Sequence, residues 1–176
     1  WEKENDDPKF DKFQENLTHN FFDKEINPSG KLVLFSESVD TLNYLYDRLT
    51  KEIGRSDVLM VTAANRNRLE QTIKENFDAN FDSDSMRYNI IITSDVLAEG
   101  VNLHRSNVIV NYDSPWNATR LMQRIGRVNR IGSVADKIYN YMFYPSMQGN
   151  QEIHLYSNAL IKLQGFHSAF GEDAQI

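Results

Sequence analysis

Residues 121–132 read Leu-Met-Gln-Arg-Ile-Gly-Arg-Val-Asn-Arg-Ile-Gly, which combines three arginines with a glutamine and no acidic residue. On a helix, residues three, four and seven apart return to the same side, so Gln123, Arg127 and Arg130 are expected to share one face. Arg124 points away from that face. Because a guanidinium forks onto phosphate oxygens, the face suits a polyanion, above all a triphosphate. The alternative is a solvated basic helix that makes weak surface ion pairs.

The composition is that of a globular protein, with 176 residues of which 40% are hydrophobic, enough for one domain with a sizeable core. The net charge of −6 argues against binding nucleic acid by bulk charge, although a local basic face fits an acidic body. Cysteine is absent, which excludes disulfides and thiolate metal sites, and the four histidines lack metal-ligand spacing. We therefore expect no metal site formed by this chain alone.

The ends of the chain and its apolar runs bear on its location. No run is long enough to span a membrane, and the polar start at Trp1 has no signal peptide. We expect a cytoplasmic protein, nucleoid-associated if bacterial, without a membrane partner. Because the first residue is not Met, we also expect a piece of a longer or processed chain.

Short apolar runs alternate with amphipathic stretches along the chain. The runs predicted as strands are 31–35, 58–61, 88–92, 108–110 and 137–143. The predicted helices begin at Asp7-Pro8, Val39, Asn65 and Ser114-Pro115. This order predicts an α/β fold, a doubly wound and mainly parallel sheet with helices on both faces. In such sheets ligands bind at the carboxyl ends of the strands.

Polar loops follow several of these strands. Residues 92–103 end a buried strand and gather hydroxyl, carboxylate, glycine and amide groups. Ser94 could donate to a phosphate of a nucleic acid, Gly100 would let backbone approach a ligand closely, and Asn102 could bond a ribose hydroxyl. The alternative for each is ordinary turn and cap chemistry. The acidic loop at residues 78–85 is the internal segment that we expect to be least ordered.

A phosphate-binding P-loop is absent from the sequence, since GxxxxGK[ST] occurs nowhere in it. The pair Gly30-Lys31 lacks an upstream glycine at the required spacing and precedes a strand. No Asp-Glu pair follows an apolar strand to hold magnesium. The chain alone is therefore not expected to cradle a nucleotide, and in isolation we expect it to be inactive as an ATP hydrolase.

Three stretches, in this order and spacing, resemble the second motor domain of superfamily 2 helicases and translocases. Residues 31–38 resemble motif IV, 92–103 resemble motif V, and 123–130 resemble motif VI, written QRxGRxxR. The similarity covers roughly residues 31–143. The tail at 130–132 makes the Swi/Snf-like type, including the bacterial RNA-polymerase-associated ATPase, the sub-group that the chain most resembles.

The resemblance implies a RecA-like (P-loop NTPase-type) fold and a role in ATP hydrolysis with Mg²⁺, both bound mainly by an N-terminal motor domain of the same polypeptide. Arg127 and Arg130 match the arginine fingers that reach the γ-phosphate, and Gln123 matches a nucleotide-side residue. Gly100 and Asn102 are further candidates for nucleotide binding. DEAD-box members of the family have Asp at the position of Asn102, where it contacts the ribose. Compared with that carboxylate, the amide of Asn102 can still form hydrogen bonds but carries no charge.

Nucleic acid is the partner that the resemblance implies, with DNA expected and RNA as the alternative. Ser94 matches the motif V hydroxyl that touches the nucleic-acid backbone, and Arg124 matches a position used for interdomain or nucleic-acid contacts. We also expect Ser36 and Thr62, in loops after the first two strands, to contact nucleic acid. Glu99 stands where DEAD-box proteins have arginine, which argues against that group. RNA polymerase is a further candidate partner.

These observations predict an N-terminal helix packing on the domain (1–27), a helicase C-terminal RecA-like domain (28–145) and a C-terminal helical extension (146–176). The predicted function is the C-terminal motor domain of an ATP-dependent DNA-binding helicase or translocase. One alternative is a non-catalytic α/β interaction module that retains the motor fold. A flavodoxin-like signalling domain is the other, and it would have no use for the arginine helix.

Overall fold

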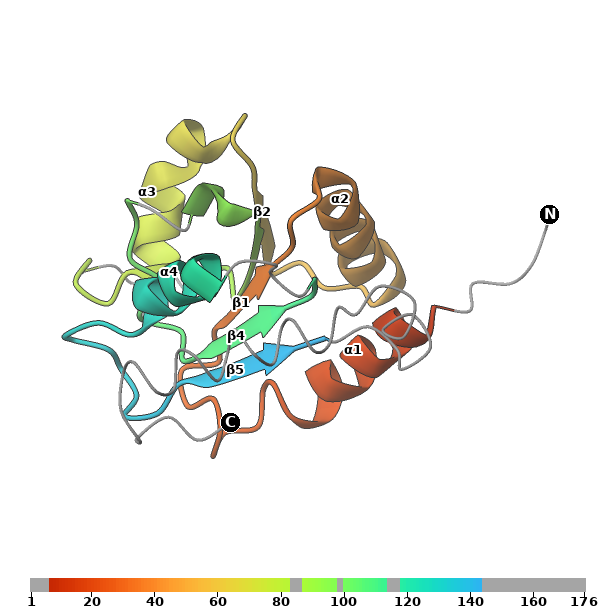
Figure 1. Cartoon of the computed structure of the whole chain (residues 1–176), viewed down its shortest axis with the longest axis horizontal. Coiled ribbons are helices and arrows are strands. Elements are labelled where there is room, and N and C mark those ends of the chain that lie inside the picture. Colours follow the sequence, from red (N-terminus) through yellow and green to blue (C-terminus); the bar gives the residue numbers. More distant parts are fainter. Residues whose placement is uncertain (1–6, 83–86, 98–99, 114–117, 144–176) are drawn as a thin grey trace.

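The computed structural model describes residues 7–82, 87–97, 100–113 and 118–143, with the side chain of Ala118 left aside (Figure 1). Five parallel strands form one sheet in the order β2-β3-β1-β4-β5. Their bounds are β1 Leu32–Phe35, β2 Val58–Val61, β3 Ile90–Thr93, β4 Val108–Asn111 and β5 Tyr139–Met142. The predicted α/β class and parallel sheet are confirmed, and each predicted strand overlaps an observed one.

The three central strands are buried along their whole length. Successive side chains of a strand point to opposite faces, so Leu32 and Leu34 of β1 enter one core cluster while Val33 and Phe35 enter the other. Helices therefore have to cover both faces, which is why these strands read as continuous apolar runs.

Within the described residues, four α-helices and two shorter turns precede or connect the strands. Their bounds are α1 Pro8–His19, α2 Val39–Asp47, α3 Arg66–Phe77 and α4 Ala118–Val128, with a π-helical turn at Arg48–Glu52 after α2 and a 3-10 turn at Asp95–Leu97 after β3. The side chain of Asp7 accepts from the backbone N–H groups of Lys9 and Phe10, and Ser38 caps α2 by accepting from Thr41 N–H. Both caps stand where the sequence predicts a helix to begin.

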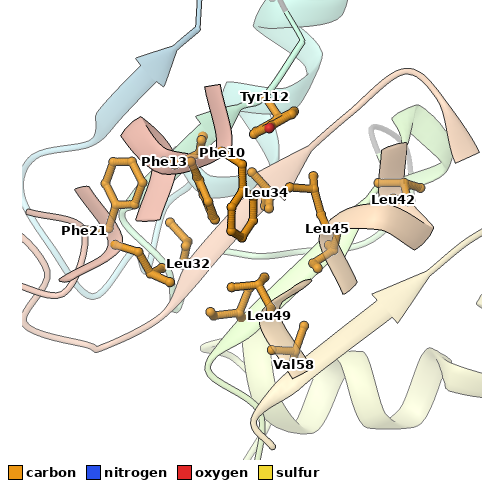
Figure 2. Packing of buried hydrophobic residues seen from close by; sticks show 14 of the residues in the cluster. Phe10, Phe13, Phe21, Leu32, Leu34, Leu42, Leu45, Leu49, Val58 and Tyr112 are labelled. Atoms are coloured by element: carbon orange, nitrogen blue, oxygen red, sulfur yellow. The ribbon is translucent and has the colours of Figure 1, made fainter. Parts of the chain in front are cut away.

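One face of the sheet is covered by α1 and α2, and the other by α3 and α4 (Figure 1). On the first face, Phe10, Phe13 and Phe21 pack beside Leu34 and Tyr112, as Figure 2 shows. The ring of Phe13 lies 5.8 Å from those of Phe21 and Tyr112, centroid to centroid. The aromatic side chains of the N-terminal helix thus belong to the same core as the sheet.

One segment differs from the sequence prediction, and a second, the acidic loop, lies partly outside the described residues. Helix α4 ends at Val128, so Arg130 lies beyond it in a turn where Ser133 N–H donates to the Arg130 carbonyl at 3.0 Å. The described part of the acidic loop, residues 78–82, is held in place, because Arg105 donates to the Phe81 carbonyl. The expected start of α4 at Ser114-Pro115 and the expected extension 146–176 lie outside the described residues. None of the described helices is long and apolar enough to cross a membrane.

The aromatic contacts of α1 predict a large effect of truncation. Phe13→Ala should destabilise the protein by about 3–5 kcal/mol, because a fully buried ring is replaced by a cavity. Urea unfolding followed by circular dichroism measures this. The control Gln14→Ala, on the exposed side of the same helix, should change stability by less than about 0.5 kcal/mol. Equal small effects of both changes would mean that α1 is not part of the domain core.

Candidate functional site

The register of the sheet brings its carboxyl ends together. Phe35 of β1 is paired with Thr93 of β3 and with Asn111 of β4, and Val61 of β2 is also paired with Thr93. The loops that follow these strands therefore start from one edge of the sheet. This is the edge at which open α/β sheets bind ligands, and Ser36, Thr62 and Ser94 follow the strands at this edge.

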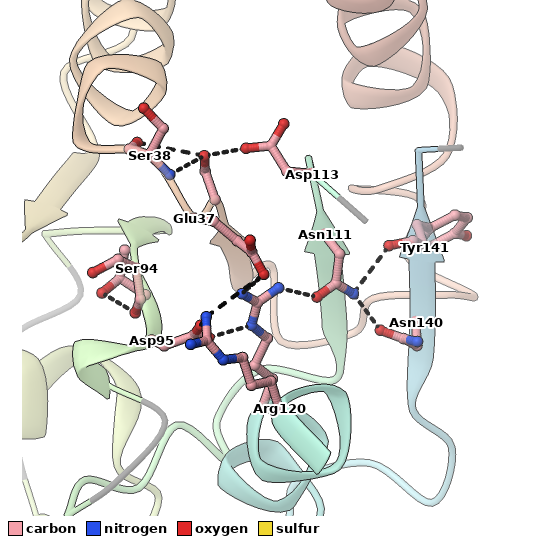
Figure 3. Close-up of polar contacts among 12 residues, drawn as sticks. Glu37, Ser38, Ser94, Asp95, Asn111, Asp113, Arg120, Asn140 and Tyr141 are labelled. Atoms are coloured by element: carbon pink, nitrogen blue, oxygen red, sulfur yellow. Dashed lines mark hydrogen bonds and ion pairs between the residues drawn. The ribbon is translucent and has the colours of Figure 1, made fainter. Parts of the chain in front are cut away.

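A buried guanidinium joins α4 to this edge (Figure 3). The side chain of Arg124 is fully buried. Its Nε donates to the Asp95 carboxylate at 2.6 Å, and its Nη1 donates to the Asn111 side-chain oxygen at 3.0 Å. The guanidinium also lies 5.0 Å from the centre of the Phe35 ring. Arg124 thus ties α4 to the ends of β1, β3 and β4.

The partners of Arg124 are themselves fixed. Asn111 donates through its Nδ2 to the Asn140 side chain at 2.8 Å and to the Tyr141 carbonyl, both on β5. Asp95 also accepts from Arg120 at 3.1 Å, one turn before Arg124 on α4. An ion pair removed from water is most stable when its partners are bonded as well, and both Asp95 and Asn111 have such further bonds. The Nη2 of Arg124 lies 4.0 Å from the Glu37 carboxylate. The position of α4 is therefore well defined.

Ser36 has a structural partner as well. Its side chain is buried and donates to the Asp113 carboxylate, which also accepts from Lys9 of α1 at 2.9 Å. Burial opposes ionisation of Asp113, but the hydrogen bonds from Ser36 and Lys9 hold its pKa below the ordinary value. This cluster connects the loop after β1 with the loop after β4 and with the N-terminal helix.

The sequence predicts that Ser36 and Arg124 contact nucleic acid, and in this structure both side chains are fully buried and have partners within the domain. The reason is that each follows or faces a strand end whose polar groups need partners inside the protein. Thr62 and Ser94, in contrast, are half-buried at the same edge and keep part of their surface exposed.

The other motif VI residues lie toward the surface. Gln123 and Arg127 are half-buried on α4, and Arg130 is exposed just after it. The backbone at the end of α4 is held by the Leu103 N–H, which donates to the Arg127 carbonyl at 2.9 Å. Arg130 donates through Nη1 to the Asn102 side-chain oxygen and through Nε to the Gly126 carbonyl at 3.2 Å. These two partners are neutral oxygens and not carboxylates.

The segment between β3 and β4 contributes two further candidates. Asn102 lies beside Arg130, as just described. Gly100 has a φ of +81°, which favours glycine, and an added Cβ would stand 2.6 Å from a guanidinium nitrogen of Arg66. The close approach that we predicted at Gly100 is thus occupied by a side chain of α3 in this structure. Among the described residues, no group of acidic or histidine side chains could hold a metal ion.

Some residues of this edge were not singled out from the sequence. Asp95, Asn111 and Asp113 all accept hydrogen bonds that fix the site, yet each reads as ordinary loop or strand-end chemistry. Their position directly at the ends of buried strands was the available indication. The partners lie 13 to 77 residues away along the chain, so local patterns could not identify them.

Comparison with known proteins is consistent with this geometry. The family model described as "Helicase conserved C-terminal domain" matches residues 9–132, more than half of the chain. The chain belongs to this helicase C-terminal domain family. The match includes α1 and all of α4, so the arginine stretch and its anchor Arg124 lie inside the family region.

Individual relatives of this helicase C-terminal domain cover parts of it. An uncharacterised ATP-dependent helicase of Bacillus subtilis, YqhH, is 37% identical over 84 residues, which is 47% of this chain and 14% of that protein. The C-terminal part of the Fun30 ATPase domain has a TM-score of 0.68 at 19% identity, over 87% of this chain and 47% of that one.

A structure of S. cerevisiae Dbp5 bound to RNA and ADP BeF3 has a TM-score of 0.62 at 24% identity, over 95% of this chain and 37% of that one. These two structures show the RecA-like fold. The chain spans less than half the length of each of these three relatives, YqhH and the two solved structures.

The buried anchor predicts a stability effect. Arg124→Ala should destabilise the domain by about 1–3 kcal/mol, because the buried Asn111 side-chain oxygen loses the donor Arg124. Arg120→Ala is the control: it lies on the same helix and pairs with the same carboxylate, but its side chain is 51% exposed, so a change of about 0–1 kcal/mol is expected. Thermal and urea unfolding of both variants would test this. Similar effects would show that Arg124 is not an anchor.

Proposed function

We propose that this chain is the C-terminal motor domain of an ATP-dependent nucleic-acid helicase or translocase. In this role Arg127 and Arg130 act as arginine fingers on the γ-phosphate of ATP, with Gln123, Gly100 and Asn102 on the nucleotide side of the cleft. An N-terminal motor domain of the same polypeptide supplies the phosphate loop and the carboxylates for Mg²⁺. Membership of the helicase family supports the use of ATP.

The observation that carries the proposal is the contrast between neighbouring arginines. Arg124 is buried on a carboxylate, whereas Arg130 is exposed on a neutral amide. A guanidinium on an amide can exchange that partner for phosphate oxygens and gain a charge-assisted bond, without breaking an ion pair. Because the anchor and the fingers share one stretch, closing the cleft would move the fingers as a rigid set toward the nucleotide.

The two fingers would act mainly on the transition state. Negative charge develops on the transferred phosphoryl group and its leaving oxygen, and a positioned guanidinium stabilises it by roughly 10³- to 10⁵-fold in rate. Because the fingers come from a second domain, hydrolysis depends on how the two domains are arranged. That dependence couples the ATP cycle to movement on nucleic acid. The chain alone lacks the P-loop and is proposed to hydrolyse no ATP.

The nucleic-acid side of the proposal rests on Ser94 and Thr62. Both are half-buried at the carboxyl edge of the sheet, at the ends of β3 and β2, where hydroxyl groups can donate to phosphates. We propose DNA as the substrate, with translocation on duplex DNA as in Swi/Snf-like proteins. The sequence at 130–132 supports this sub-group, and RNA polymerase is a candidate partner. RNA is the alternative, since the fold is shared with a Dbp5 bound to RNA.

Arginine replacement tests the finger assignment. In the complete enzyme, Arg127→Ala or Arg130→Ala should lower the ATPase kcat by about 10³-fold or more, with the melting temperature nearly unchanged. Lysine should restore little, because an ammonium group cannot make the bidentate fork. Steady-state phosphate release and thermal melts measure both quantities.

The matched control is Arg87→Ala, an exposed arginine that precedes β3 and lies outside the motif VI stretch. It should leave both quantities unchanged. If Arg127→Ala and Arg130→Ala also kept normal turnover, or if they merely unfolded the domain, the non-catalytic interaction module would be the better description.

Binding of nucleic acid by this chain alone should be weak. The net charge is −6, so the dissociation constant should fall in or above the nonspecific range of about 10⁻⁴ to 10⁻⁶ M, and it should rise steeply with salt. Titration of labelled single- and double-stranded DNA and RNA at two salt concentrations measures this. Tight binding at physiological salt would reveal a specific site that Ser94 and Thr62 do not explain.

A further inference from the structure

The side chain that holds Arg130 has two chemically different ends. Asn102 can present its oxygen, which accepts a hydrogen bond, or its NH₂ group, which only donates. Arg130 is itself a donor, so only the oxygen end can bind it. In the structure the Asn102 oxygen does face Arg130 Nη1. The orientation of one amide therefore decides whether the guanidinium is attracted or repelled.

Asp78 fixes that orientation. The Nδ2 of Asn102 donates to Asp78 Oδ2 at 3.2 Å. An ionised carboxylate only accepts hydrogen bonds, so the NH₂ end of Asn102 has to face it and the oxygen has to face away. Asp78 is the residue that follows α3, 24 residues before Asn102, and it belongs to none of the three motif-like stretches.

Asp78 is in turn held by its surroundings. Its Oδ1 accepts from the Asn80 N–H at 3.0 Å, and its side chain is only 12% exposed. The buried His104 ring lies 3.6 Å from the same oxygen. Burial lowers the pKa of His104, and this outweighs the opposing attraction of Asp78. The ring faces Oδ1, so Asp78 Oδ2 is left to accept from Asn102.

The chain after α4 packs against the same group. Gly132 has a φ of +90°, and a Cβ at this position would lie 3.2 Å from the Asn80 side-chain oxygen and 3.7 Å from His104 Nε2. The Val134 N–H donates to the His104 carbonyl at 3.3 Å. The turn that follows Arg130 thus packs against Asn80 and His104, close to Asp78. The positive φ of residue 132 favours glycine at this position.

We propose that Asp78 is a positioning residue for the finger Arg130 and that it acts through the polarity of Asn102. This proposal rests on the function proposed above. A guanidinium has five N–H groups, and the contacts with Asn102 and Gly126 use two of them. Three remain to fork onto phosphate while Arg130 stays in place. Asn102 thereby positions Arg130, and Asp78 positions Asn102.

In the hydrogen-bonded relay Asp78–Asn102–Arg130, the residue that contacts Arg130 is neutral and the carboxylate stands behind it. This arrangement has a functional consequence. If a carboxylate stood at position 102, it would bind Arg130 by a charge-assisted bond that competes with the phosphate. The amide supplies a weaker, neutral acceptor, and Asp78 supplies the charge one step further away. Arg130 is therefore oriented by a chain of hydrogen bonds but is not neutralised by a direct ion pair.

Reversal of the hydrogen-bond polarity tests the relay in the complete enzyme. In Asp78→Asn the new amide oxygen still accepts from Asn80 N–H, so its NH₂ group faces Asn102, which has to turn its own NH₂ group toward Arg130. The kcat should fall about 10- to 100-fold with little change in the KM for ATP, since the finger acts in the transition state. Asn102→Asp alone should also lower kcat, because it places two carboxylates in contact.

The double variant Asp78→Asn/Asn102→Asp restores a donor facing an acceptor and turns an acceptor toward Arg130, so kcat should rise above that of either single variant. It should stay below that of the parent, because the new carboxylate competes with the phosphate for Arg130. Failure of the double variant to recover, or a drop in melting temperature that accounts for the lost activity, would overturn the relay. A rise in KM without loss of kcat would also overturn it and assign Asn102 to the ribose.

Arg130→Ala separates failure of the relay from failure of the proposed function. If Arg130→Ala lowers kcat but Asp78→Asn does not, the relay alone is wrong. If Arg130→Ala has no effect, the finger assignment itself is wrong. When both assignments hold, Asp78→Asn should cause no further loss in the Arg130→Ala background, because the two changes act on the same interaction.

Discussion

The burial of one guanidinium sets the geometry on which the rest of the site depends. Arg124 enters the interior of the domain and bonds to Asp95 and Asn111, at the ends of β3 and β4. A charge in that environment is stable only with a well-placed partner, so the helix that carries it cannot slide or rotate freely. The residues three and six positions later then occupy defined places at the end of α4, where Arg130 lies beside Asn102.

The same short stretch therefore holds arginines with opposite requirements. The anchor needs a carboxylate and exclusion of water, because its function is to stay in place. Arg130 needs a partner that it can keep or share when a phosphate approaches, and it lies exposed on a neutral amide. This difference in partner, more than the number of arginines, distinguishes a proposed catalytic face from an ordinary basic helix.

Much of the fold could be predicted because it depends on local chemistry. Continuous apolar runs predicted the parallel strands, and the pair Asp7-Pro8 predicted the start of α1. The site was harder. The sequence could not distinguish a buried arginine from an exposed one, since Arg124 and Arg130 belong to the same motif and differ only in what the folded chain places beside them.

The remaining differences have the same origin. The end of α4 before Arg130 depends on packing of the following turn against His104, with Gly132 in a left-handed conformation. Asp78 lies in a loop whose sequence shows only acidic and small residues. Its proposed role depends on Asn102, which is 24 residues away along the chain. Tertiary contacts of this kind leave no periodic pattern in the sequence, so only the three-dimensional structure reveals them.

The most direct test of the central claim is a structure of the complete enzyme with ADP and a fluoride mimic of the γ-phosphate. The account predicts that the guanidiniums of Arg127 and Arg130 lie about 2.7–2.9 Å from the mimic, while Arg124 keeps its bond to Asp95. The account would be contradicted if both arginines stayed bonded within their own domain and another residue of the enzyme contacted the mimic.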